Sequence, residues 1–410
     1  MLKLGGVVIR MRENKVRYLV GSEHILVRPR VPFDENICDF LDTFSKEILK
    51  DDVLKSYPDV VSFAFWIRKA NIQKQKNEHG LNYQRLGRGV GFHIAPSNVP
   101  INAMFTFVFG LLSGNNNIVR ISTKDSPQIN LLCDKLNLLL KRDEYVEIYE
   151  ENAIVQYEKC QNVTDFFSEM ADIRVIWGGD DTIKEIRKSP LKPRAKDLVF
   201  ADRYSFGVIK PEYILDLSDV EMKSFVKNFY NDTYLMDQNA CSTPHMIFWL
   251  SQDKDMIEQA QSYFWEQVYE EAKKYALEDI KVSEKYTNLC LYATQNEKAT
   301  EERSISVQHY ENILYVIKEK NIPINLCEKR GKFGMFYQCN ISDLSEIKDC
   351  INSKIQTVAI AGIEKKEVQE WIVENRLKGI DRVVSFGKTL DIGLIWDGYD
   401  LIAEMSRVIG

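Results

Sequence analysis

Strands alternate with helices along most of the chain, and this alternation limits the fold more than any other feature. Segments rich in β-branched and aromatic residues are separated by segments with helical spacing of apolar residues. Strand–helix–strand units of this kind form parallel sheets. The predicted strands are 90–95, 117–121, 153–157, 173–177, 205–209, 246–250, 313–317, 335–339, 357–361 and 382–386. The predicted helices are 100–112, 127–142, 162–170, 180–187, 218–234, 254–275, 344–353 and 366–377. The sequence therefore predicts an α/β protein in two lobes.

The first 84 residues form a different, α+β region. Strands are predicted at 6–9 and 16–20, and the segment 37–70 is predicted to be helical because its apolar residues have helical spacing. A polar stretch at 69–80 then marks the predicted boundary of this region.

Composition excludes several classes of protein. The 410 residues are 45% hydrophobic and 28% charged, which is typical of a globular protein and excludes a disordered or collagen-like chain. The formal net charge is −6, so the chain lacks the excess of basic residues that is typical of a nucleic-acid-binding protein. The most apolar window, 99–112, is shorter than the roughly 20 residues of a membrane span. We therefore expect a cytoplasmic protein with no membrane span.

The eight cysteines contain no CxxC pair, so we expect no structural metal.

The turn after the first parallel strand is the first candidate site. Residues 95–100 (APSNVP) connect a strand to a helix, so they lie at the carboxyl end of a sheet, where α/β proteins bind ligands. Asn98 can offer two N–H donors there, or it can be a turn asparagine between prolines. The glycines at 87, 89 and 91 form no dinucleotide fingerprint, because they precede the strand.

A second strand-to-helix turn contains Gly178 and Gly179. Two glycines allow the backbone to approach a ligand closely, and a helix N-terminus favours phosphate. The two acidic residues that follow, Asp180 and Asp181, are equally suited to capping the helix.

The third candidate is Cys241, within the segment MDQNACSTPH at 236–245. We expect Cys241 on a loop or helix end, among small residues that leave room for a substrate. A cysteine nucleophile needs such access and nearby hydrogen-bond donors. Two alternatives stay open: an inert buried thiol, and the nucleophile of a hydrolase with His245 as its base.

These segments occur in the order found in the acyl-CoA reductase family, and the sequence resembles that family over residues 85–407. The family is typified by the fatty-acid reductase of bacterial bioluminescence. The matching stretches are GVGFHIAPSNVPINAMFTFVFGLLSGNNNIVRIS, VIWGGDD, DQNACSTPH and DRVVSFGKTLDIGLIWDGYDLI. The family is a branch of the aldehyde dehydrogenase superfamily, so the resemblance implies two parallel-sheet lobes, one for the cofactor and one for catalysis.

The resemblance also implies domains. We expect an N-terminal strand and helix region at 1–84, a nucleotide-binding domain at 85–236, a catalytic cysteine domain at 237–385 and a closing segment at 386–410. The closing segment contains Trp396, Asp397 and Gly398, whose role stays open between structure, closure of the active site and a subunit contact.

Individual residues receive roles from the same resemblance. Cys241 aligns with the superfamily nucleophile. Asn98 aligns with the asparagine that forms the oxyanion hole together with the backbone N–H of the nucleophile. Pro96 and Ser97 align with contacts to the nicotinamide, and Arg120 with a contact to the adenosine ribose. Gly178 and Gly179 align with the turn that contacts the pyrophosphate.

Two departures from the superfamily pattern carry information. Relatives that use NAD often have a glutamate three residues after the position of Arg120, where this chain has Thr123 followed by Lys124. A missing carboxylate beside two cations fits a 2′-phosphate, so we expect NADPH, with NADH as the alternative. Aldehyde-oxidising relatives also have a glutamate that activates water, but the matching stretch 198–203 (LVFADR) has only Asp202.

A reductase needs no such base, because hydride removes the acyl group as an aldehyde. The resemblance thus implies an NADPH-dependent reductase that converts an acyl thioester to the aldehyde through an acyl-cysteine. The acyl donor is acyl-CoA or an acyl-protein, in the second case with an acyl-protein synthetase as partner, and superfamily members usually form homo-oligomers. The alternatives are a non-catalytic nucleotide-binding scaffold and a cysteine thioesterase.

Overall fold

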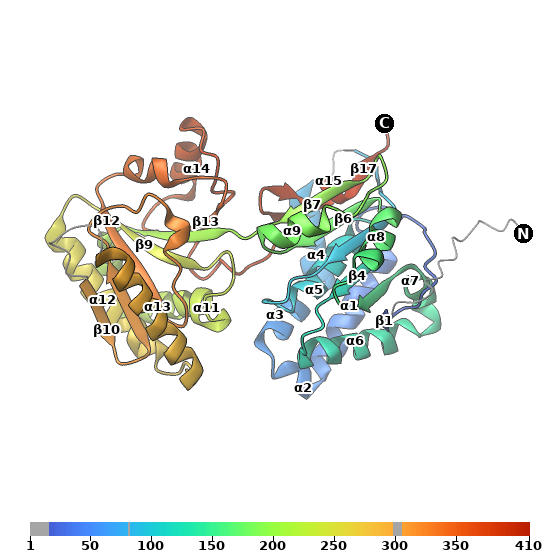
Figure 1. Ribbon diagram of the computed structural model, residues 1–410, viewed down its shortest axis with the longest axis horizontal. Coiled ribbons are helices and arrows are strands. Elements are labelled where there is room, and N and C mark those ends of the chain that lie inside the picture. The colour runs from blue at the N-terminus through green and yellow to red at the C-terminus, as the bar shows by residue number, and fades with distance from the viewer. Residues whose placement is uncertain (1–15, 81–82, 298–305) are drawn as a thin grey trace, which may run out of the picture. The chain divides into compact units, whose positions relative to one another are not determined.

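The computed structural model describes residues 16–80, 83–297 and 306–410, and these fold into two compact units (Figure 1). The first unit contains the described residues up to Ala201 together with Gly393–Gly410, and the second contains Asp202–Ile392. The predicted α/β class with two lobes is confirmed. The strand predicted at 6–9 lies outside the described residues.

A six-stranded sheet is the centre of the first unit. In order across the sheet, its strands are β1 (Arg17–Val20), β5 (Ala153–Gln156), β4 (Asn116–Ile121), β3 (Val90–Ile94), β6 (Ile173–Trp177) and β7 (Lys196–Phe200). All neighbouring strands are parallel except β1, which is antiparallel to β5. The interior strands are covered on both faces, which explains their nearly continuous apolar sequences. Strand β7 was not predicted.

Helices pack on both faces of this sheet. The helices of this unit are α1 (Glu35–Lys50), α2 (Asp52–Lys55), α3 (Pro58–Trp66), α4 (Lys69–His79), α5 (Asn102–Leu112), α6 (Pro127–Leu140), α7 (Val146–Glu151), α8 (Gln161–Met170), α9 (Asp180–Ile186) and α15 (Leu401–Met405). Side chains of β3 alternate between the faces, as strand geometry requires. Phe92 packs on Phe167 of α8 with ring centroids 5.4 Å apart, and the next residue, His93, bonds to Thr106 of α5.

The helical character predicted for 37–70 is confirmed, but the segment is broken into α1, α2 and α3, and α4 begins at Lys69. Asp51 ends α1, and its carboxylate accepts hydrogen bonds from the Val53 and Leu54 N–H groups at the start of α2. Pro58 then occupies the first turn of α3, where a proline is tolerated but cannot continue a preceding helix. The polar stretch predicted as a boundary is itself the helix α4.

A buried hydrogen-bond network lies between β3 and α5. His93 is fully buried, with its Nδ1 2.8 Å from Thr106 Oγ1 and its Nε2 3.0 Å from Asn117 Oδ1. An amide oxygen only accepts, so Nε2 carries the hydrogen and the Thr106 hydroxyl donates to Nδ1. Burial lowers the pKa of His93 from 6.5 to about 4, so the imidazole is neutral at neutral pH.

This histidine predicts a loss of stability in acid. Below pH 6.5 the unfolded chain gains a proton at His93, whereas the folded protein resists it until about pH 4. The contribution of the neutral, buried His93 to the free energy of unfolding is therefore fully present above pH 6.5 and is lost as the pH falls towards 4. Urea denaturation at pH 7 and pH 5 should show the free energy of unfolding falling by about 2 kcal/mol more for the wild type than for His93→Gln. Equal losses in both proteins would contradict the prediction.

The C-terminal segment folds back onto the first unit. Strands β15 (Ile395–Trp396) and β16 (Tyr399–Asp400) form a hairpin whose two central residues, Asp397 and Gly398, have φ values of 56° and 78°. Positive φ at both positions is the signature of a type I′ turn, for which Asp-Gly is a preferred sequence. Strand β17 (Ser406–Val408) pairs with β2 (Arg85–Gly87). The structure thus gives Asp397 and Gly398 a place in a hairpin turn.

The second unit has a seven-stranded sheet. In order, its strands are β10 (Ser306–Tyr310), β11 (Leu314–Lys318), β12 (Met335–Ile341), β9 (Pro244–Leu250), β8 (Tyr204–Ile209), β13 (Ile355–Ala361) and β14 (Arg382–Ser385). Only the edge strand β10 is antiparallel. Because β8 belongs to this sheet, the second unit begins before it, whereas the predicted division lay at 236–237.

Two apolar clusters cover the faces of this second sheet. The helices are α10 (Pro211–Asp216), α11 (Asp219–Thr233), α12 (Lys254–Ala272), α13 (Asp279–Glu297) and α14 (Lys365–Glu374). Helix α13 was not predicted, and the segment predicted as helix 344–353 forms a 3₁₀ helix at Leu344–Cys350. Within the described ranges, no helix combines the length and the apolar character needed to cross a membrane.

Candidate active site

The carboxyl edge of the first sheet gathers all the predicted cofactor residues. Strand β3 is parallel to both of its neighbours, β4 and β6, with Ile94 paired to Arg120 on one side and to Ile176 on the other. The segments that follow these three strands therefore emerge at one edge, where α/β folds bind ligands. The predicted residues at this edge are Pro96, Ser97, Asn98, Arg120, Thr123, Gly178 and Gly179.

Asn98 lies in the bend after β3 and is exposed, as is Ser97, whereas Pro96 is half-buried. The helix predicted from Pro100 begins later, at Asn102. An asparagine that fixes a turn bonds its side chain to the nearby backbone. Within the described part of the chain, Asn98 makes no such side-chain bond, so the structure favours an amide available to a ligand over a turn asparagine.

Arg120 is held by Tyr157, and part of its hydrogen-bonding capacity is unused. Its guanidinium carbon is 5.1 Å from the centroid of the Tyr157 ring, and Nη2 donates to the Tyr157 carbonyl oxygen at 3.4 Å. Its buried Nε has no hydrogen-bond partner among the described residues, which is a costly arrangement. Thr123 and Lys124 are exposed just beyond the end of β4. These residues fit the adenosine end of a nicotinamide dinucleotide.

The turn after β6 leaves open space at its second glycine. A Cβ added to Gly178 would lie 3.1 Å from Thr182 Cγ2, whereas one added to Gly179 would meet nothing within 4 Å. The N-cap of α9 is Gly179, and no side chain caps this helix. Because Gly179 is the N-cap, neither acidic residue occupies that position, and Asp181 pairs with Lys184 at 3.2 Å. The backbone here can be approached closely, as a pyrophosphate requires.

Cys241 lies in the second unit, on the turn between the 3₁₀ helix η2 (Tyr234–Met236) and β9. The predicted position outside a strand is confirmed. The turn is closed by the Thr243 N–H, which donates to the Ala240 carbonyl oxygen at 3.0 Å. The buried Ser205 hydroxyl donates to the Cys241 carbonyl oxygen at 2.7 Å. Cys241 is half-buried, which does not match an inert core thiol.

Other cysteines have the properties of inert thiols. Cys38, Cys133 and Cys339 are buried, and burial raises their pKa values to about 11, 12 and 11. Thiols with such pKa values stay protonated at neutral pH and are poor nucleophiles. The described residues contain no cluster of His, Cys, Asp and Glu side chains that could hold a metal ion.

The residues just before Cys241 adopt an unusual backbone conformation. Asp237 and Gln238 have φ values of 52° and 58°, in the left-handed region that non-glycine residues rarely occupy. The buried Gln238 carboxamide accepts hydrogen bonds from the Gly334 and Met335 N–H groups at 2.7 and 3.2 Å and donates to the Met335 carbonyl at 3.0 Å. These three bonds fix the conformation. No local sequence pattern marks Gln238 as the residue that fixes this conformation.

Asp232 connects the Cys241 turn to the segment SFGKT at 385–389. Its carboxylate accepts from the Gly387 N–H at 2.5 Å and the Thr389 N–H at 3.1 Å, while its carbonyl accepts from the Thr243 hydroxyl at 2.9 Å. Burial raises the pKa of Asp232 to about 6. The segment 385–389 therefore supports the Cys241 turn indirectly, through Asp232.

His245 is unsuited to act as a general base. It lies in β9, fully buried, with its ring stacked on Tyr204 at 5.3 Å. Burial, assisted by the nearby positive charge of Arg330, lowers the pKa of His245 to about 3. A general base works best with a pKa near the operating pH, so the arrangement disfavours the hydrolase alternative.

Replacing His245 should therefore leave the chemistry of Cys241 unchanged. In His245→Gln, we expect the pH profile of Cys241 acylation between pH 6 and 9 to overlay that of the wild type, because the imidazole is neutral throughout this range. Stopped-flow acylation across that range measures the profile. If the acylation rate of the wild type changed with an apparent pKa near 6 to 7, and this change disappeared in the variant, the hydrolase alternative would be supported.

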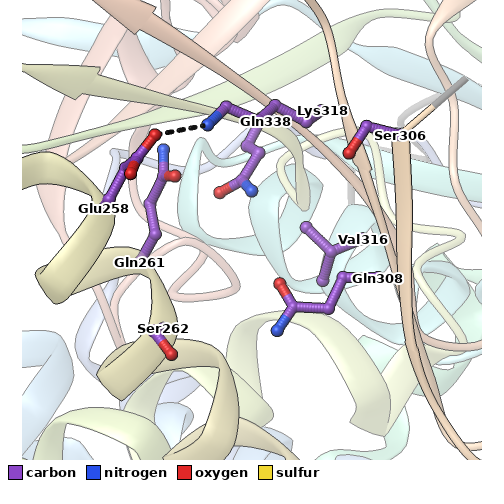
Figure 2. Close-up of a pocket in the computed structure, with 8 residues that line it drawn as sticks. All are labelled: Glu258, Gln261, Ser262, Ser306, Gln308, Val316, Lys318 and Gln338. Carbon is purple, nitrogen blue, oxygen red and sulfur yellow. Dashed lines mark ion pairs between the residues drawn. The ribbon is translucent and has the colours of Figure 1, made fainter. Parts of the chain in front are cut away.

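The second unit also has a polar pocket of about 240 Å³ between α12 and strands β10, β11 and β12 (Figure 2). At its wall, Lys318 Nζ and Glu258 Oε1 are 3.6 Å apart. Gln338 Oε1 accepts hydrogen bonds from the indole N–H groups of Trp249 and Trp265 at 3.0 and 2.8 Å. No predicted site residue lines this pocket, and its polar wall does not suit an acyl chain.

The fold defines the class of protein. Among solved structures, it is similar to lactaldehyde dehydrogenase from Escherichia coli, with a TM-score of 0.60, 11% identity and coverage of 91% of this chain and 85% of that one. It is also similar to glyceraldehyde-3-phosphate dehydrogenase GapN from Methanocaldococcus jannaschii, solved with NADP, with a TM-score of 0.58, 14% identity and coverage of 92% and 86%. The chain therefore has the aldehyde dehydrogenase fold, as expected.

Sequence identifies the family. The sequence model described as Acyl-CoA reductase (LuxC) matches residues 64–408, and the chain belongs to this family. Its curated relatives include a long-chain acyl-protein thioester reductase of Aliivibrio fischeri, 20% identical over 78% of this chain. Another is long-chain acyl-protein thioester reductase 2 of Photobacterium leiognathi, 21% identical over 79% of this chain. In both comparisons the chain spans 63% of the length of the relative.

Proposed function

We propose that this protein reduces an acyl thioester to an aldehyde, with Cys241 as the nucleophile that carries the acyl group. The observation that supports this most strongly is the half-buried Cys241 on a hydrogen-bonded turn, in a chain of the acyl-CoA reductase family. The Cys241 thiolate attacks the thioester carbonyl carbon, the thiol of the donor leaves, and a thioester forms on Sγ.

Two N–H donors stabilise the negative charge that develops on the carbonyl oxygen in this step. We assign them to the Asn98 side chain and the Cys241 backbone. In acyl-transfer enzymes, each such donor contributes about 3–4 kcal/mol of transition-state stabilisation. The exposed Asn98 amide, with no side-chain bond to the described backbone, supports this role.

The direction of the reaction follows from a missing water-activating base. Strand β7 and the loop after it carry no glutamate, and the Asp202 carboxylate is 3.0 Å from Arg330 Nη1 in an ion pair. Because Arg330 engages this carboxylate, Asp202 is a poor substitute for the missing glutamate, and the acyl group on Cys241 is protected from hydrolysis. When bound, a reduced nicotinamide cofactor supplies the hydride that converts the acyl group to an aldehyde. Cys241 then departs as a thiolate.

We assign NADPH as the cofactor in preference to NADH. Pro96 and Ser97 would border the nicotinamide, and Gly178 and Gly179 the pyrophosphate. Arg120 and Lys124 supply the positive charge that a ribose 2′-phosphate needs, with Thr123 between them.

A single substitution tests this assignment. Thr123→Glu places a carboxylate where it repels the 2′-phosphate and can accept from a 2′-hydroxyl. We expect the KM for NADPH to rise by about 10- to 100-fold, as for the loss of 1.4 to 2.8 kcal/mol of binding, while the KM for NADH falls. Thr294→Glu is the control, because Thr294 is an exposed residue of α13. Unchanged preference in Thr123→Glu would contradict the assignment.

The acyl donor is best argued from the curated relatives, whose names specify an acyl-protein. We propose an acyl-protein thioester, formed by an acyl-protein synthetase, with free acyl-CoA as the second candidate. NADPH oxidation and aldehyde release should be compared for acyl-CoA and for an acylated synthetase at equal acyl concentration. Aldehyde from either donor supports the reductase. Nucleotide binding without aldehyde from either donor would indicate the scaffold alternative, and free acid in place of aldehyde would indicate a thioesterase.

A further inference from the structure

Two hydrogen bonds fix the peptide groups on both sides of Cys241. The Ala240 carbonyl accepts from the Thr243 N–H inside the turn. A trans peptide directs its C=O and N–H to opposite sides, so the Cys241 N–H points away from the interior of the turn. The next peptide group is fixed through the Cys241 carbonyl, which accepts from Ser205 Oγ at 2.7 Å.

The Ser205 hydroxyl accepts one hydrogen bond and donates another. Ser205 is fully buried at the start of β8, and its Oγ accepts from the Thr357 N–H of β13 at 3.2 Å. A hydroxyl has a single hydrogen, and that hydrogen goes to the Cys241 carbonyl. Ser205 thus connects the nucleophile turn to two neighbouring strands in the middle of the second sheet.

The other end of the turn is clamped independently. Gln238 is held in its left-handed conformation by three bonds to Gly334 and Met335 at the start of β12. Sparsely populated backbone conformations persist when the surrounding contacts over-determine them, and they cluster at functional sites. The turn is therefore tied to β12 before Cys241 and to β8 at Cys241 itself.

We infer that Ser205 is a positioning residue for Cys241: its hydroxyl fixes the peptide plane that follows the nucleophile, so that the thiolate and the Cys241 N–H reach an acyl carbonyl together. The inference rests on the proposed function, because it assigns the Cys241 N–H to the developing oxyanion. Acyl transfer needs the thiolate and the Cys241 N–H to be correctly oriented relative to the same carbonyl group. Alkylation of the thiolate needs only that the reagent can reach the sulfur.

This difference gives the test. The burst of p-nitrophenolate from p-nitrophenyl octanoate reports acylation of Cys241: the thiolate forms a thioester and p-nitrophenolate leaves. Iodoacetamide, followed by peptide mass, reports alkylation of Cys241. In Ser205→Ala we expect the burst rate to fall by about 10- to 100-fold, as for a displacement of about 1 Å, and the alkylation rate to change by less than about 3-fold.

Three further variants make the result decisive. Ser205→Thr retains the hydroxyl and should recover most of the burst rate, and Ser205→Cys, a weaker donor, should lie between the serine and alanine proteins. Ser45→Ala is the matched control, because Ser45 is also fully buried and donates to a backbone carbonyl, that of Ala64 at 2.6 Å, in the first unit. Both of its rates should equal those of the wild type.

Each contrary outcome has a separate meaning. If burst and alkylation fall in parallel in the Ser205 variants, or if neither falls, Ser205 has no positioning role. If the wild type gives no burst that Cys241→Ala removes, the proposed function fails and the inference fails with it. Should Ser205→Ala not fold, as judged by thermal unfolding, the ratio of burst to alkylation in Ser205→Cys decides the question.

Discussion

Replacing Cys241 by alanine should reduce aldehyde formation by about 10⁴-fold or more, to the background rate, because no covalent acyl intermediate can form without the thiolate. Cys241 is half-buried on a turn, so the smaller side chain leaves the core of the second unit intact, and thermal unfolding should change little. Coupled measurement of NADPH oxidation and aldehyde release gives the rate.

A matched control for this prediction is Cys290→Ala. Cys290 is the exposed cysteine of α13, where its thiol contributes nothing to the proposed chemistry. This variant should retain the wild-type rate. If Cys241→Ala kept even a tenth of the activity, the acyl group would have to be carried elsewhere, and Cys241 would lose its assigned role.

Removing the side-chain oxyanion donor should have the second-largest effect. In Asn98→Ala we expect kcat for acyl transfer to fall by about 10²- to 10³-fold, the usual cost of one lost donor, with KM for the thioester nearly unchanged. The effect falls on kcat because the charge on the oxygen develops only in the transition state. Asn98→Asp should be at least as impaired, since a carboxylate repels the oxyanion.

The exposed asparagine Asn36 of α1 gives the control, because it lies on a helix with no predicted site residue. Asn36→Ala should behave as the wild type in kcat and KM. An Asn98→Ala protein with an elevated KM and a normal kcat would show that Asn98 binds the substrate without stabilising the transition state.

Much of the fold could be predicted because its physical signals are local. Buried parallel strands such as β3 and β6 are short apolar runs, and turns between strand and helix are marked by Pro96, Gly178 and Gly179. The break in the first helical region was missed because the apolar spacing continues across Asp51, whereas the capping carboxylate and Pro58 determine where the helices end. The Asp397-Gly398 turn has a readable sequence, but the prediction attached no conformation to it.

The site could be predicted only in part. Cys241 and Asn98 belong to recognisable motifs, so their candidacy needs no coordinates. The roles of Ser205, Gln238 and Asp232 depend on strands that are distant in sequence but adjacent in the second sheet, and no local pattern marks them. His245 is the opposite case: its closeness to Cys241 in sequence suggested a base, but complete burial lowers its pKa too far.

The covalent state of Cys241 tests the central claim most directly. The purified protein should be incubated, without nucleotide, with short-, medium- and long-chain acyl thioesters of CoA and of N-acetylcysteamine, and its intact mass measured beside that of Cys241→Ala. We predict one added acyl group on the wild type, none on the variant, and discharge of the adduct as aldehyde when NADPH is added. A folded wild-type protein that acquires no acyl group, or a Cys241→Ala protein that acquires the same one, would contradict the account.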